Sequence, residues 1–63
     1  MSKRRFVKEY AYDKARALAA LAKEHPQNAE ACRARIGDIG RAVYLWNRGM
    51  IIADEAMRLI ADA

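Results

Sequence analysis

The chain has 63 residues, with 12 Lys and Arg against 8 Asp and Glu, a formal charge of +4, and 54% apolar residues. It contains one Ser, one His, one Cys and no Thr, which excludes a catalytic triad, a zinc cluster or a disulfide within one chain. A chain this short forms a single domain, residues 1–63, and buries only about 60% of its unfolded surface, so a second copy or a partner would add needed stability.

The composition predicts an all-α protein. Ala accounts for 14 residues, whereas Leu, Ile, Val and Phe together number 12, and Ala is the best helix former. No stretch approaches the roughly 20 apolar residues that span a bilayer. We therefore expect a cytoplasmic protein without a membrane-spanning helix, and the lone Cys fits a reducing compartment. Peripheral attachment of the basic first helix to anionic membranes is a further alternative, which we disfavour because the apolar face of that helix is mostly Ala.

The first predicted helix runs from about residue 3 to residue 24. Apolar residues recur in it at spacings of three and four and predict one buried face. They are Val7, Tyr10, Ala11, Ala17, Leu18, Leu21 and Ala22. Pro26 ends this helix, because the residue before a proline is pushed out of the helical region. Asn28 is then the expected N-cap of the next helix.

The second predicted helix, about residues 28–48, carries apolar residues on two faces. The main face is a heptad seam formed by Ala29, Cys32, Ile36, Ile39, Val43, Trp46 and Met50. A second face lies about 120° away and consists of Ala31, Ala34, Ala42 and Leu45. A helix with two apolar faces needs two neighbours. One can be the first helix, and the other is either a third helix or another chain.

Gly49 predicts the end of the second helix, since residues 45–50 fit a Schellman motif with an apolar contact between Met50 and Leu45. A short third helix then spans about residues 52–61, with Asp54 and Glu55 in its first turn, where the helix dipole favours acids. Its expected apolar face consists of Ile52, Ala56, Leu59 and Ile60. The alternative is a two-helix hairpin with one long second helix, since a single Gly costs only about 1 kcal/mol.

Between residues 44 and 60, an apolar helix end is followed by Gly49-Met50-Ile51, by Asp54-Glu55-Ala56 and by a closing Leu59-Ile60. This order resembles the helical hairpin of the short C-terminal domain family, usually called SHOCT. In that family a Ser, Thr or acidic residue usually caps the second helix, whereas Ile52 and Ala53 stand there in this chain. The resemblance implies a small helical association module with no catalytic residues to carry over.

Two groups of basic residues are candidate contacts for phosphate or for a partner protein. The first is the cluster Lys3, Arg4, Arg5 and Lys8, where positive charge opposes the dipole of the first helix. The second is a stripe within about 80° of the second helix, formed by Arg33, Arg41 and Arg48 together with Gly37 and Tyr44. A basic stripe with a basic tail is typical of phosphate binding. The alternative is that these charges bind no partner and only keep a helix face and a frayed N-terminus in contact with water.

Gly37 and Gly40 interrupt the second helix, and a helical Gly costs stability unless another helix uses the missing side chain to approach closely. That helix belongs either to the hairpin or to a second copy. We favour the second copy, because the first helix alone cannot cover both apolar faces. The expected self-association residues are Ala31, Ala34, Gly37, Ala42 and Leu45.

The other residues of chemical interest have structural interpretations. Cys32 lies on the seam and is expected to be a small buried apolar side chain. His25 has no second His or Cys to complete a metal site. Asp54 and Glu55 are adjacent and so point to different sides of a helix, which prevents their acting as a facing acid–base pair. The aromatics at helical spacing are expected in the core rather than stacked on bases, namely Phe6, Tyr10, Tyr44 and Trp46.

The sequence thus predicts a three-helix bundle, alone or as a dimer, without catalytic residues, cofactor, metal or small-molecule substrate. The expected function is a non-enzymatic helical interaction module that binds itself or another protein. The alternative is an accessory protein that binds nucleic acid nonspecifically through the basic tail and the Arg stripe. Base-specific reading by a helix-turn-helix is not expected, because the last helix offers two acids and only Arg58 at its start.

Overall fold

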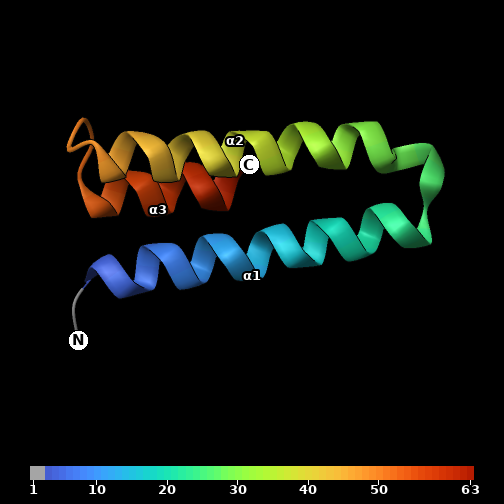
Figure 1. Cartoon of the computed structure of the whole chain (residues 1–63), viewed down its shortest axis with the longest axis horizontal. Coiled ribbons are helices and arrows are strands. Elements are labelled where there is room, and N and C mark those ends of the chain that lie inside the picture. Colours follow the sequence, from blue (N-terminus) through green and yellow to red (C-terminus); the bar gives the residue numbers. More distant parts are fainter. Residues whose placement is uncertain (1–2) are drawn as a thin grey trace.

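A computed structural model describes the backbone of residues 3–63 and the side chains from residue 6 onward. Within this range the chain forms α1 (Lys3–Glu24), a short 3-10 helix (Pro26–Asn28), α2 (Ala29–Asn47) and α3 (Ala53–Asp62), with no strand. The first two α-helices form an antiparallel hairpin, and α3 folds back beside them (Figure 1). The predicted all-α three-helix fold is confirmed.

The turn between α1 and α2 is built around Pro26. The amide of His25 donates to the carbonyl of Leu21 at 2.9 Å and closes α1, and the amide of Asn28 donates to the carbonyl of His25 at 2.8 Å. Pro occupies the first turn of a helix at no cost, because its missing N–H would be unpaired there. Asn28 precedes α2 as expected, but its side chain makes no capping bond within the described residues, so that part of the prediction is wrong.

Gly49 separates α2 from α3. Its φ of 77° lies in the left-handed region, which favours glycine. Its amide donates to the carbonyl of Trp46 at 3.0 Å, and the amide of Met50 donates to that of Leu45 at 2.9 Å. These two bonds define a Schellman motif. The alternative of one long second helix is therefore wrong.

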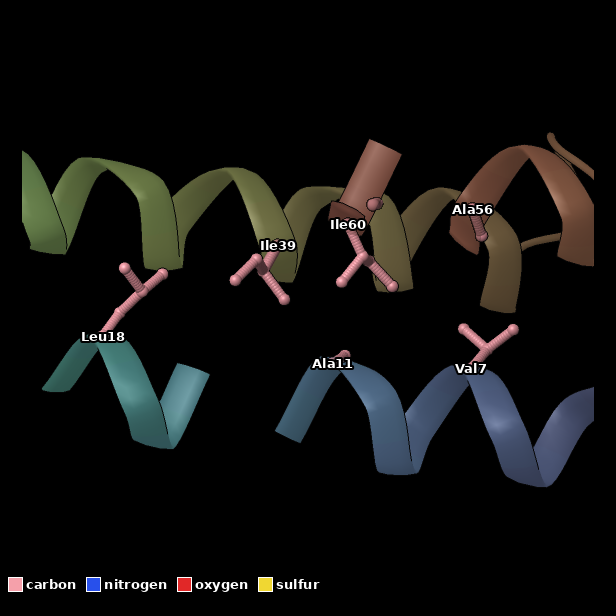
Figure 2. Packing of buried hydrophobic residues seen from close by; sticks show 7 residues of the cluster. Val7, Ala11, Leu18, Ile39, Ala56 and Ile60 are labelled. Atoms are coloured by element: carbon pink, nitrogen blue, oxygen red, sulfur yellow. The ribbon is translucent and has the colours of Figure 1, made fainter. Parts of the chain in front are cut away.

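The core is small and draws on all three helices (Figure 2). Each helix contributes an alanine, and small side chains let the helix backbones approach one another. Val7, Ala56 and Ile60 are 0% exposed and fill the centre. The full set of buried apolar residues in this cluster is Val7, Ala11 and Leu18 from α1, Ile39 and Ala42 from α2, and Ala56 and Ile60 from α3.

Two cations of the hairpin bind the C-terminal end of α3. Lys14 on α1 donates from Nζ to the carbonyl oxygen of Ile60 at 2.7 Å and also to that of Ala61. Arg35 on α2 donates from Nη2 to a backbone oxygen of Ala63 at 3.0 Å. Cations suit this place, because the last carbonyls of a helix have no intrahelical partner and carry partial negative charge.

α3 covers only the half of the hairpin that lies away from the turn (Figure 1). The last carbonyls of α3 already lie at Lys14, near the middle of α1. Ala17 and Leu21, which the sequence placed on the buried face of α1, are exposed. That prediction is wrong because α3 ends before it reaches them.

The inward faces of α2 and α3 also differ in part from the prediction. On α2, Met50 lies beyond the helix and is exposed, and the remaining seam residues are buried or half-buried. On α3, Ile52 and Leu59 are exposed rather than buried. Their places are taken by Ala53 and Met57, which continue the seam spacing of α2 and pack against the core.

None of the helices in the described chain is long and apolar enough to cross a membrane.

Candidate functional site

A groove runs between α1 and α2 on the side of the hairpin that α3 leaves uncovered. Its cavity volume is about 360 Å³, and no residue of α3 lines it. α1 contributes Lys8, Ala11, Tyr12 and Ala15, and α2 contributes Ile36, Ile39, Gly40 and Val43. Ile36 and Val43 are only half-buried, so the floor of this α1/α2 groove is apolar surface that nothing in the described chain covers.

Each helix of the hairpin carries an exposed tyrosine with an arginine four residues later, and Tyr12 of these two tyrosines lines the groove. On α1, the Arg16 guanidinium carbon lies 5.5 Å from the centroid of the Tyr12 ring. On α2, that of Arg48 lies 5.9 Å from the centroid of the Tyr44 ring. These are cation–π contacts, in which the guanidinium is attracted to the face of the aromatic ring. Tyr12 is 63% exposed and Tyr44 is 52% exposed, so both pairs are available to a partner.

The two helical glycines of α2 have open space where a side chain would be. A Cβ placed on Gly37 or Gly40 would meet no atom within 4 Å in the described chain, apart from the neighbouring backbone of its own helix. Close approach within the hairpin is therefore not what these glycines serve. Each costs roughly 0.5–1 kcal/mol relative to Ala, and no described part of the chain uses the space gained.

The predicted basic residues that can be placed lie on the surface. Lys8, Arg33, Arg41 and Arg48 are all exposed. Lys8 lines the groove, and Arg33 lies two turns before Gly40 on the same side of α2. Arg41 instead lines a hollow between α2 and α3. The side chains of Lys3, Arg4 and Arg5 lie outside the described residues.

The acids near these bases lie outside the lining of the α1/α2 groove. Glu9 and Asp13 lie on the outer flank of α1, in a shallow hollow that they share with Lys8 and Tyr12. Asp38 and Asp62 line the hollow between α2 and α3. Within the described residues, the lining of the α1/α2 groove contains Lys8 and no acid.

The predicted self-association residues do not form one open surface. Ala42 is 2% exposed, because α3 packs over it, and Leu45 is half-buried beside it. Ala31 and Ala34 lie beyond the end of α3 and are exposed, as is Gly37. α3 is thus the second neighbour of α2 at one end only. Self-association of the chain stays a prediction.

Sequence reasoning missed the groove because its lining depends on how α1 packs against α2, and it also placed too many aromatic residues in the core. Tyr10 and Trp46 are half-buried against the core, but Phe6 and Tyr44 are exposed, so that expectation is wrong for these two. Tyr44 lies about 160° around α2 from Ala42, which packs under α3, so it faces away from the core. The i, i+4 spacing of Tyr and Arg in both helices was the available signal. The prediction that Cys32 is buried is confirmed.

The side chains around the groove form a contact surface. Within the described residues, no three His, Cys, Asp or Glu side chains come together in a group that could hold a metal ion. The groove supplies an aliphatic floor, the ring of Tyr12 and the cation of Lys8, which are groups that bind a partner through burial and charge. No family model, curated protein or solved structure matches the chain significantly, and the resemblance to the SHOCT hairpin stays a prediction.

Proposed function

We propose that this protein is a non-enzymatic helical interaction module that binds a partner protein through the α1/α2 groove. The observation that carries the proposal is the uncovered apolar floor of this groove, with Ile36 and Val43 half-buried and Gly40 open. A bundle this small has little apolar surface to leave unused. The lone, buried Cys32 suits a reducing compartment such as the cytoplasm.

Aromatic and arginine side chains support a binding role, because both are enriched at protein interfaces. The hairpin offers two exposed Tyr–Arg pairs, one on each helix, and Tyr12 of the α1 pair lines the groove. The two open glycines add space for a partner to approach α2 closely. All of these features lie on the side of the hairpin that α3 does not occupy.

Photo-cross-linking in the native cells tests this function. A photoreactive amino acid at Gly40 points into the groove, whereas the same residue at Ala34 lies on an exposed part of α2 outside it. We expect a defined adduct from position 40 and a much weaker one from position 34. Equal labelling from both positions, or no adduct from position 40, contradicts the proposal.

Nucleic-acid binding is the second candidate function, and the exposed cations on both helices favour it. Lys8 lines the groove, Arg33 and Arg48 are exposed on α2, and Tyr12 and Tyr44 could stack on unpaired bases. Each cation that binds phosphate releases condensed counterions, so affinity would fall steeply with salt. Replacing these three cations with Gln should lower the salt slope by up to about three units. Absence of any retention on DNA or RNA near about 50 mM salt rejects this candidate.

A further inference from the structure

We propose that α3 can leave its own hairpin and pack in the same place on a second copy of this chain. In the resulting exchanged dimer, α2 and α3 join into one helix that runs through Gly49. The interaction surface is the face of the hairpin that α3 covers in the monomer. This surface is distinct from the α1/α2 groove, whose lining contains no residue of α3, so the proposal goes beyond the proposed function. Three features of the chain around Gly49 support it.

The first feature is the helical phase that the apolar residues of α2 and α3 share. The seam spacing of α2 continues beyond Met50, at alternating steps of three and four, through Ala53, Met57 and Ile60. In the monomer these three residues of α3 pack against the core of the hairpin. A helix that runs straight through Gly49 would present its α2 part and its α3 part on one side. Two such helices, antiparallel about a two-fold axis at the hinge, would each place α3 on the hairpin of the other copy.

The second feature is the exposure of Met50, a seam residue that the monomer leaves outside the core. Its side chain is 67% exposed, because the backbone leaves the helical path at Gly49. In the exchanged dimer Met50 would return to the seam, at the hinge where the two copies meet, and its burial there favours association. The contacts of α3 are otherwise the same in both forms. Lys14, for example, would donate to the carbonyl of Ile60 in the other copy.

The third feature is that opening the turn costs no backbone hydrogen bond. The amide of Gly49 donates to the carbonyl of Trp46, and that of Met50 donates to the carbonyl of Leu45. In a continuous helix each amide bonds the carbonyl four residues earlier, so these two amides would only exchange their two acceptors. Ile52, which precedes α3, has no polar side-chain atom to cap the first amides of this helix. A continuous helix would pair those amides with carbonyls of the turn.

Gly49 keeps the monomer as the form present at low concentration. A φ of 77° costs glycine little, whereas glycine is unfavourable inside a continuous helix. Association also costs the two copies translational and rotational freedom. The exchanged dimer should therefore appear only as the concentration rises. Alanine at this position would reverse both preferences of the hinge, because it disfavours the turn and favours the helix.

Sedimentation of the Gly49→Ala chain at increasing concentration tests the proposal. We expect the dissociation constant of the dimer to fall about 100-fold or more relative to the wild type, which is about tenfold for each of the two hinges. The matched control adds Ala53→Pro to Gly49→Ala. Proline at the first position of α3 suits the monomer, because Ile52 before it is extended, with a ψ of 163°. The same proline would interrupt a continuous helix, so this double variant should stay monomeric.

A photo-cross-link shows which hairpin α3 packs on. Met57 packs against the core in the monomer, so a diazirine analogue of methionine at this position joins α3 to the hairpin that holds it. The sample is an equal mixture of isotope-labelled and unlabelled Gly49→Ala chains. We expect a covalent dimer on a denaturing gel, with cross-linked peptides that combine the two isotopes. Adding Ala53→Pro should abolish this dimer and leave cross-links within one chain.

The other outcomes overturn the proposal. Gly49→Ala may not remain a monomer up to about 1 mM, nor stay unfolded at every concentration, since the exchanged dimer avoids the disfavoured turn. A Gly49→Ala dimer with cross-links only within each chain places the second copy on another surface. A dimer that is equally tight with Ala53→Pro excludes a continuous helix. Each of these results refutes the exchange of α3 but leaves the proposed function standing, because the cross-link from position 40 tests that function separately.

Discussion

Replacing Gly40 with Ala should make the isolated protein more stable. A helical Gly is about 0.8–1.0 kcal/mol less favourable than Ala, because its unfolded backbone has more freedom to lose. The added Cβ meets no atom within 4 Å in the described chain, so no steric cost offsets this gain. For a domain of this size, 1 kcal/mol corresponds to roughly 4–8 °C in the unfolding midpoint.

Thermal unfolding followed by far-UV circular dichroism measures the effect, at several protein concentrations. Gly49→Ala is the matched control, because the same substitution at a φ of 77° should lower stability by about 1–2 kcal/mol. If Gly40→Ala lowers the midpoint at every concentration, another element lies against Gly40, and the groove is not open as described. If it lowers the midpoint only at high concentration, a second copy occupies the groove.

Four further substitutions probe the core and the attachment of α3. Ile60→Ala removes a side chain that is 0% exposed and should cost about 2–5 kcal/mol, whereas Leu59→Ala on the exposed side should cost below about 1 kcal/mol. Lys14→Met keeps the apolar stem but removes the donor to the end of α3, and should cost about 1–2 kcal/mol in chemical denaturation. Trp46→Ala should cost about 2–3 kcal/mol, below the value for a fully buried Trp, because this side chain is only half-buried against the core.

These predictions have separate controls. A domain of this length has a total stability of about 3–9 kcal/mol, so Ile60→Ala is compared with Ile60→Val, which should retain the fold. Lys23→Met removes an exposed cation from the last turn of α1, where the helix dipole favours it, and should cost below about 1 kcal/mol. A cost for Lys14→Met no larger than that for Lys23→Met would show that the bonds to Ile60 and Ala61 contribute nothing.

The sequence predicts the helices well because their boundaries depend on local chemistry. Pro26 and Gly49 are recognisable from residue type alone, and each ends a helix as expected. The extent of burial is predicted less well, because it depends on where α3 stops. Leu21 has the same helical phase as the buried residues of α1 but lies beyond the reach of α3. Nothing in the spacing of apolar residues encodes that difference.

The candidate site was predictable only in part. The exposed cations Arg33 and Arg48 are visible as a stripe on the second helix, but the placement of Lys8 in a groove against α2 requires the packing of two helices. The role of Lys14 leaves no signal in the sequence, since a lysine bound to a distant carbonyl resembles any solvated lysine. The sequence left open whether another helix packs against Gly40, and the hairpin shows open space at this position.

The short reach of α3 divides the molecule into two halves that should open independently. Three helices pack together at one end, whereas only two do so near the turn, with Leu18 and Cys32 as the buried residues there. Amide hydrogens should therefore exchange faster around residues 17–34 than around residues 39–46, because fewer contacts must break for a local opening. The thiol of Cys32 would become reactive whenever the two-helix half opens, while the fluorescence of Trp46 would report the three-helix half. The protein thus contains a native reporter in each half. Comparing the rate of Cys32 labelling with the rate of change in Trp46 fluorescence would test whether the two halves open independently.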